Sequence, residues 1–262
     1  MKTFRQALQG AGFPITAELA PDHQTTAEEL LRRAGTLSAF VDAIQIADNP
    51  AGGTQVSPVA LAHLLLQQGI DAIPRLDCRD RNRIALQSDL LGLRALGVSS
   101  LILEQGEPLR AGSDKARPVF DINCNELVAM AHAISEEQWP DTEHEFLIGT
   151  KADVVDPVAG WSPDELLARG KAGARFLQTG PCPDLELLQA YMQQLVESRV
   201  TWNYSVIVTL AVDPGQEGVE TCARTVRDMA NIPGVSGINI PCKGDPGKLI
   251  EAIDASGLKK RP

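Results

Sequence analysis

IPRLDCRDRNRIALQSDLLG, residues 73–92, contains a strand signal, a turn and a helix signal in immediate succession. The apolar run ends at Asp77, and a helical pattern follows almost at once with Asp80 or Asn82 available as its N-cap. In a parallel α/β protein, such a turn faces a ligand pocket because the strand's carboxyl end and the helix's amide-rich start open to the same side. Three arginines in this turn are candidates for binding a phosphate, unless they are only solvated: Arg79, Arg81 and Arg83.

The same alternation of strand and helix signals continues along the chain. Expected strands cover residues 15–19, 43–48, 72–78, 100–105, 145–152, 175–180, 205–210 and 237–241. Expected helices cover residues 25–37, 58–68, 83–96, 125–134, 163–172, 184–198 and 219–229. Eight strands, mostly about 30 residues apart, predict an α/β fold of one domain over residues 1–262, a single (β/α)8 TIM barrel. A doubly wound sheet shares the alternation, but the count of eight and the lack of GxGxxG at the first helix favour the barrel.

The composition and the net charge limit which cellular compartment and which binding partners we expect. No window reaches the roughly 18 unbroken apolar residues of a membrane span, and the start MKTFRQALQGAGF shows no leader, so we expect a cytoplasmic protein. Five cysteines without CxxC spacing agree with a reducing compartment. A net charge of −10 argues against nucleic acid and anionic membranes as partners, because both need a basic surface.

Glu18 is the first catalytic candidate. It lies in ITAELAPD at the end of the first expected strand, so a barrel would place it at the mouth that holds the active sites of such enzymes. Its apolar neighbours favour the protonated acid, which can hand a proton to a nitrogen. The structural alternative is a buried glutamate paired with a neighbouring arginine or lysine.

Four segments resemble the bacterial methylenetetrahydrofolate reductases that carry a CRDRN motif. The segments are LDCRDRN with IALQSDLLGLRALGV at 76–98, PVFDINCNELV at 118–128, KAGARFLQTGPCPD at 171–184 and EGVETCARTVRDMANIPGVSGINI at 217–240. The resemblance implies a TIM barrel in which NAD(P)H reduces a flavin, FAD or alternatively FMN. The flavin then passes hydride to 5,10-methylenetetrahydrofolate to give 5-methyltetrahydrofolate. It also implies a small-molecule folate substrate, and we expect a homo-oligomer.

Residue roles follow from this resemblance. Glu18 matches the glutamate that protonates the folate ring nitrogen and so opens the ring to the iminium that accepts hydride. Glu107 matches the aspartate of an arginine-glycine-aspartate turn beside the flavin, where a negative charge tunes the cofactor. The remaining candidates for cofactor binding are Asn49, Arg75, Arg79, Gln105, Gly106, Asp121, Lys151 and Arg169. The candidates for substrate binding, besides Glu18, are Gln178 and Thr179.

The chain also departs from the family pattern. Relatives have threonine-glutamine-proline at the end of the sixth strand, where this chain has Thr179, Gly180 and Pro181. Gln178 lies two positions earlier and would point elsewhere unless the strand slips or bulges. The connection over residues 211–236 is short, and aromatic residues make up only 4% of the chain. These departures put the substrate and the flavin affinity in question.

Three classes of function remain. The first is a flavin-dependent methylenetetrahydrofolate reductase. The second is a folate-binding or flavin-binding paralogue in one-carbon metabolism whose reductase activity is lost or altered. The third is a zinc-dependent methyltransferase barrel, because Cys78, Cys182 and Cys242 follow the third, sixth and eighth strands. Free cysteines are more often small core residues, so the third class is the weakest.

Overall fold

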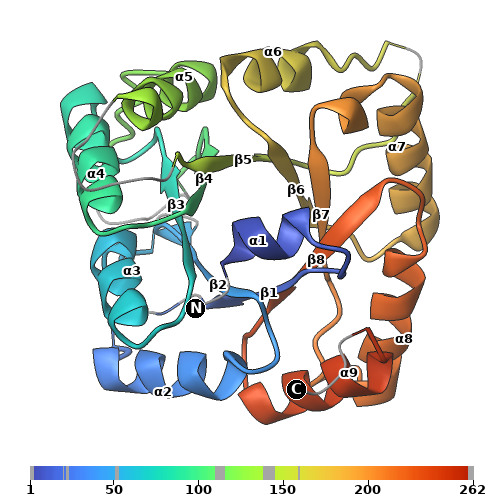
Figure 1. The fold of residues 1–262 in the computed structure, drawn as a ribbon. Coiled ribbons are helices and arrows are strands. Elements are labelled where there is room, and N and C mark those ends of the chain that lie inside the picture. The colour runs from blue at the N-terminus through green and yellow to red at the C-terminus, as the bar shows by residue number, and fades with distance from the viewer. Residues whose placement is uncertain are drawn as a thin grey trace.

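The computed structural model describes residues 3–19, 21, 24–50, 53–109, 116–137, 145–158 and 160–258. Within these residues, eight parallel strands form a closed barrel in which each strand pairs with its neighbour in sequence and β8 pairs with β1 (Figure 1). The strands are β1 (Ile15–Leu19), β2 (Ala43–Ile46), β3 (Ala72–Asp77), β4 (Ser100–Glu104), β5 (Leu147–Ala152), β6 (Phe176–Pro181), β7 (Ser205–Thr209) and β8 (Val235–Pro241). The protein is therefore the single TIM barrel that the sequence predicts.

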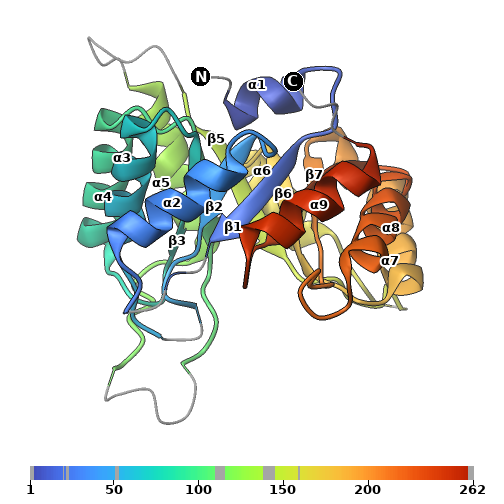
Figure 2. The same ribbon diagram turned by 90° about the horizontal axis from the view of Figure 1, so that it is seen from below.

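A layer of helices surrounds the barrel (Figures 1 and 2). The helices of the described residues are α1 (Phe4–Gln9), α2 (Ala27–Leu37), α3 (Pro58–Gln67), α4 (Arg83–Ala95), α5 (Cys124–Glu136), α6 (Asp164–Ala172), α7 (Leu185–Glu197), the 3-10 helix η2 (Val200–Trp202), α8 (Val219–Ala230) and α9 (Pro246–Ser256). Every expected strand and helix is present with ends within two residues of the prediction. The prediction missed α1, η2 and α9. No helix of the described residues has both the length and the apolar character needed to cross a membrane.

Side-chain caps explain where the helices begin. Thr26 accepts the Glu29 N–H at 3.2 Å, and Asn82 accepts the Ala85 N–H at 3.0 Å. Asn82, and not Asp80, is therefore the cap of α4. The turn of residues 77–82 ends there, at the carboxyl end of β3, as a ligand-facing turn of a barrel should.

The hydrophobic core has two parts. The larger part lies between the barrel and its helices. The smaller part fills the amino-terminal end of the barrel and consists of six buried side chains: Phe4, Ala43, Ile73, Ile102, Phe176 and Ile207. Gly149 makes room for the Phe176 ring, because a Cβ there would stand 2.2 Å from Cζ of that ring. Polar side chains of the next layer therefore gather toward the carboxyl ends of the strands.

Helix α1 closes the amino-terminal end of the barrel (Figures 1 and 2). Phe4 is fully buried, and its ring meets Phe176 edge to face with centroids 5.3 Å apart. The Phe4 N–H donates to Asp71 Oδ2 at 2.6 Å, and Asp71 directly precedes β3. Because α1 covers the amino-terminal end, the described residues leave the carboxyl ends of the strands as the open end of the barrel.

Asp71 gives this closure a pH dependence. Burial raises the pKa of Asp71 to about 6. The folded state therefore binds the proton of this carboxyl more tightly than the unfolded state, whose pKa is about 4. The resulting contribution to stability is fully present below pH 4 and is lost as pH rises through about 6. Asp71→Asn cannot ionise, so we expect it to raise the free energy of unfolding by about 1–3 kcal/mol near pH 8 and by much less near pH 4.

Urea unfolding at the two pH values measures this difference. Glu251→Gln, which removes an exposed carboxyl on α9, is the matched control and should change neither value. An equal effect of Asp71→Asn at both pH values would contradict the assignment.

Candidate active site

Glu18 lies at the carboxyl end of β1 among the polar side chains that fill the upper barrel. Its Oε2 accepts hydrogen bonds from Arg75 Nη2 at 2.6 Å and from Asn239 Nδ2 at 3.0 Å. Its Oε1 has no partner among the residues that the structure describes. The side chains of Arg75 and Glu18 are only 9% and 16% exposed. The ion pair fixes one carboxylate oxygen and leaves the other one open to the mouth.

Gln45 carries this network across the barrel. Its Nε2 donates to Thr16 Oγ1 at 2.9 Å and to Gln178 Oε1 at 2.6 Å, and its Oε1 accepts from Arg75 at 3.1 Å. All of these residues are buried. These hydrogen bonds join residues of different strands, so the network holds the side chain of Arg75, and Arg75 in turn holds Glu18.

Gln178 points into the barrel. Regular alternation accounts for this direction, since Phe176, two residues earlier, also faces the barrel interior. The pairing of β6 with β7 shifts register only beyond it, between Gln178 and Pro181. The extra residue of such a bulge re-aims the strand's end. The bulge also uses Thr179, whose Oγ1 accepts the Thr209 N–H at 3.1 Å. Gln178 thus belongs to the polar layer beneath the mouth, and Thr179 holds two strands together.

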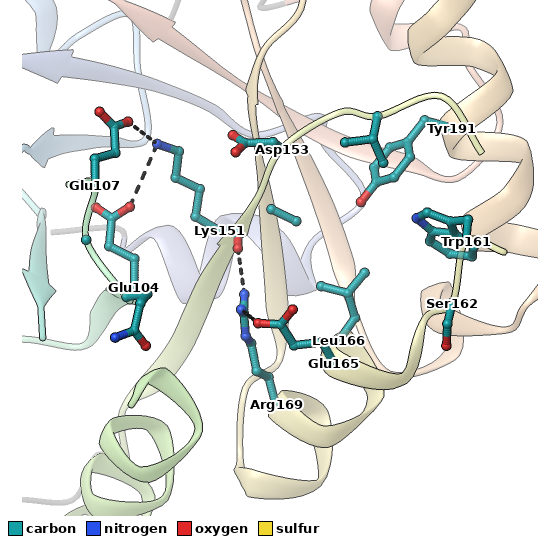
Figure 3. Close-up of a pocket in the computed structure, with 14 residues that line it drawn as sticks. Glu104, Glu107, Lys151, Asp153, Trp161, Ser162, Glu165, Leu166, Arg169 and Tyr191 are labelled. Atoms are coloured by element: carbon teal, nitrogen blue, oxygen red, sulfur yellow. Dashed lines mark hydrogen bonds and ion pairs between the residues drawn. The ribbon is translucent and has the colours of Figure 1, made fainter. Parts of the chain in front are cut away.

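A cavity of about 350 Å³ opens between the ends of β4 and β5 and helices α6 and α7 (Figure 3). Its lining combines acidic, basic and aromatic side chains. The lining residues are Glu104, Gln105, Gly106, Glu107, Lys151, Ala152, Asp153, Val155, Trp161, Ser162, Glu165, Leu166, Arg169 and Tyr191. Five of the predicted cofactor-binding or catalytic residues therefore share one cavity, which has the size and mixed lining of a small-molecule site.

Lys151 stands between two carboxylates in this cavity (Figure 3). Its Nζ is 3.8 Å from Glu104 and 3.7 Å from Glu107, and the Glu107 side chain is 67% exposed. Both distances exceed a hydrogen bond, and Lys151 Nζ donates none within the described residues. The ammonium group therefore keeps donors for a ligand oxygen.

Arg169 is nine-tenths buried at the other side of the cavity. One Nη donates to the Lys151 carbonyl at 2.8 Å, and the other contacts Glu165 (Figure 3). Its Nε is buried and has no hydrogen-bond partner in the described part of the chain. A buried unsatisfied donor is costly, so this atom is a point at which a ligand or a water molecule is expected.

The arginines of the turn after β3, which the sequence predicts as candidates for phosphate binding, contact groups of the protein itself. Arg79 is 1% exposed and donates to Asp80, to the Asn49 carbonyl at 2.8 Å and to the Glu107 carbonyl at 3.2 Å. It therefore ties together the loops that follow β2, β3 and β4. Asn49 also donates to Asp80 at 3.2 Å. In this geometry Arg79 and Asn49 shape the rim.

The other arginines of the turn are paired as well. Arg81 forms ion pairs with Asp48 and Asp89, and Arg83 pairs with Glu126. At the end of β3, burial and the nearby charge of Asp48 raise the pKa of Asp77 to about 7. The turn thus carries a carboxyl group that titrates near neutral pH.

The remaining predicted cofactor residues support the loop after β4. Gln105 Oε1 accepts the Cys124 N–H at the start of α5 at 2.9 Å. Gly106 has a φ of +87°, and a Cβ there would stand 2.9 Å from Cβ of Arg79. Only glycine fits this position. Asp121 accepts the Arg83 N–H at 2.9 Å. These contacts place Glu107 at the cavity.

The cysteines show no common site. Within the described residues, no three side chains of histidine, cysteine, aspartate or glutamate gather as metal ligands. Burial raises the pKa of Cys78 to about 12 and also raises that of Cys242. Zinc needs thiolates, so the geometry gives the methyltransferase alternative no support.

Sequence reasoning missed the parts of the site that depend on distant packing. Gln45 had a signal, since it is the single polar residue of the strand AIQI. Tyr191 had none, because it reads as one more apolar position of α7. Trp161 lines the cavity, whereas Trp202 lies before β7 at the other end of the barrel and is 74% exposed.

Solved structures share the fold at low identity. A tryptophan synthase chain from M. tuberculosis aligns with a TM-score of 0.56 and 14% identity over 95% of this chain and 94% of that chain. A 3-keto-L-gulonate-6-phosphate decarboxylase from Vibrio cholerae aligns with a TM-score of 0.56 and 12% identity, covering 94% and 97%. Comparison with curated proteins finds no match. The structural likeness shows the barrel alone.

The sequence itself matches one family model, that of methylenetetrahydrofolate reductase, over residues 3–210. The matched region runs from helix α1 through β7, so it includes Glu18, the turn after β3 and every lining residue of the cavity. Such a match covers well over half of the chain. The chain therefore belongs to the methylenetetrahydrofolate reductase family.

Proposed function

We propose that this protein reduces 5,10-methylenetetrahydrofolate to 5-methyltetrahydrofolate, using a flavin that NAD(P)H reduces. The observation that carries the proposal is the position of Glu18, which stands at the mouth of a family barrel with one oxygen fixed by Arg75 and Asn239 and one oxygen open. A proton donor for a substrate nitrogen needs this combination of fixed orientation and access. A homo-oligomer stays part of the proposal.

The lining of the cavity supports a flavin nucleotide as the cofactor. Lys151 Nζ has donors to spare, and Arg169 Nε is a buried donor without a partner, so both can meet phosphate oxygens. Trp161 provides apolar surface for a ring system. FAD is the proposed cofactor, with FMN as the alternative. A bound flavin supplies hydride transfer between NAD(P)H and the folate substrate.

The chain's own residues prepare the substrate. Glu18 holds a proton at Oε1 for the ring nitrogen, while the contacts to Oε2 keep the carboxyl group from turning away. Glu107 adds negative charge at the cavity, and Arg79 fixes the loop that carries it. The apolar layer and α1 exclude water from below, which strengthens these electrostatic contacts.

A second function, a folate-binding or flavin-binding paralogue without reductase activity, is favoured by one observation. Glu18 is held by an ion pair with Arg75 and a hydrogen bond from Asn239, and these are also the contacts of a carboxylate with a structural role. Two measurements separate the functions. Purified protein with bound flavin should lose its visible absorbance on anaerobic addition of NADH or NADPH, and methylenetetrahydrofolate should restore it. Flavin that is reduced but is not reoxidised by the folate would favour the paralogue.

Lys151→Ala tests the proposed cofactor contact. Loss of a charged hydrogen bond to phosphate should weaken flavin binding by about ten- to a hundredfold. Titration of the apoprotein with FAD, followed by flavin fluorescence, measures the dissociation constant. Lys171→Ala, which removes an exposed cation from α6 outside the cavity, should leave that constant unchanged. Equal affinities of the two variants would contradict the assignment.

A further inference from the structure

Asp153 offers the cavity an uncommitted carboxylate. It follows β5 directly, lines the cavity and has no hydrogen bond or ion pair with the residues that the structure describes. The neighbouring strand makes room for it, since a Cβ on Gly180 would stand 2.7 Å from Asp153 Oδ1. The glycine of the sixth strand therefore gives this carboxylate its place at the cavity wall.

Tyr191 brings a second free polar group to the same wall. The residue is 2% exposed, and its hydroxyl has no hydrogen-bond partner within the described residues. Figure 3 shows the hydroxyl directed into the cavity on the side of Asp153. The Tyr191 ring meets the Trp161 ring edge to face, with the ring centroids 6.2 Å apart. Burial and the charge of Asp153 raise the pKa of Tyr191 to about 12, so the hydroxyl keeps its proton and can donate.

A carboxylate and a phenol that line the same cavity favour one kind of ligand edge. The carboxylate accepts two adjacent N–H groups, and the hydroxyl donates to a carbonyl next to them. A pterin ring presents this order at its pyrimidine edge: an amino group, a ring N–H and a carbonyl. An isoalloxazine presents a single N–H between two carbonyls, and an adenine presents one amino group beside a ring acceptor. The pattern therefore matches the pterin.

We infer that Asp153 and Tyr191 bind the amino, N–H and carbonyl edge of the substrate's pterin ring. The inference rests on the proposed function and specifies which groups recognise its substrate. The carboxylate binds the amino group and the ring N–H, and the Tyr191 hydroxyl donates to the carbonyl. Gly180 serves the same contact by leaving the carboxylate unobstructed.

Binding of 5-methyltetrahydrofolate to the flavin-loaded protein, measured by calorimetry, tests the inference. Asp153→Asn should weaken binding by about ten- to a hundredfold, because an amide accepts at one atom only and carries no charge. Tyr191→Phe should weaken it by about fivefold, the effect of one neutral hydrogen bond. Asp156→Asn removes an exposed carboxyl from the same loop outside the cavity and should change nothing.

Two further measurements locate the effect. A folate analogue without the 2-amino group should bind the parent protein and Asp153→Asn with similar affinity. Gly180→Ala, whose methyl group would displace the carboxylate, should weaken binding in the parent protein but add little to Asp153→Ala. Unchanged affinity of Asp153→Asn, or loss of flavin from it, would overturn the inference while leaving the reductase proposal intact. A parent protein that binds no folate would overturn both.

Discussion

Replacing Glu18 with glutamine is expected to slow the reduction of methylenetetrahydrofolate by about a hundred- to ten-thousandfold, the usual contribution of a general acid. Glutamine keeps the length of the side chain, and its carbonyl oxygen can still accept from Arg75, which donates to Glu18 at 2.6 Å. It carries no acidic proton, however. The substrate nitrogen therefore loses its proton donor while the mouth keeps its shape.

The two half-reactions distinguish catalysis from damage to the site. Anaerobic stopped-flow should show that Glu18→Gln reduces its flavin with NAD(P)H at an ordinary rate but reoxidises it slowly with the folate. Glu28→Gln, an exposed change on α2, is the matched control for both steps. If Glu18→Gln slowed both half-reactions equally, Glu18 would be a structural partner of Arg75 and the proton would come from elsewhere.

The outline of the site was predictable because a parallel barrel turns strand ends into neighbours. Glu18, Lys151 and the segment around Glu107 each follow or end a strand, and the repeating pattern alone places all of them at one mouth. No knowledge of side-chain packing is needed for this step. The prediction of the fold and of the rim rests on that periodicity.

The roles of individual side chains were less predictable, because they depend on partners far along the chain. Arg79 is one of three arginines in its turn, and the sequence shows the charges without their acceptors. Besides the adjacent Asp80, its acceptors are the carbonyl groups of Asn49 and Glu107, which are 30 and 28 residues away. Charge runs are usually solvated, so local reasoning cannot distinguish a ligand contact from a buried support.

Helix α1 escaped prediction for a related reason. Its six residues are too few to show a clear helical period, and from the sequence this segment was considered only as a possible leader. Its stability comes from the barrel that it covers. A capping box between Thr3 and Gln6 starts it, and Phe4 anchors it against residues more than a hundred positions away.

Phe4→Ala should therefore have the largest effect on stability, about 3–5 kcal/mol in the free energy of unfolding. The ring is fully buried, so its loss removes apolar contact and leaves a cavity among the side chains at the barrel's closed end. The edge contact with Phe176 is lost as well. Urea unfolding should show a lower midpoint with an unchanged slope.

Gln9→Ala, an exposed change on the same helix, should leave the midpoint unchanged. Because the mouth lies at the other end of the strands, the folded fraction of Phe4→Ala should bind flavin with parental affinity. A midpoint close to that of the parent protein would mean that α1 covers the barrel without supporting it.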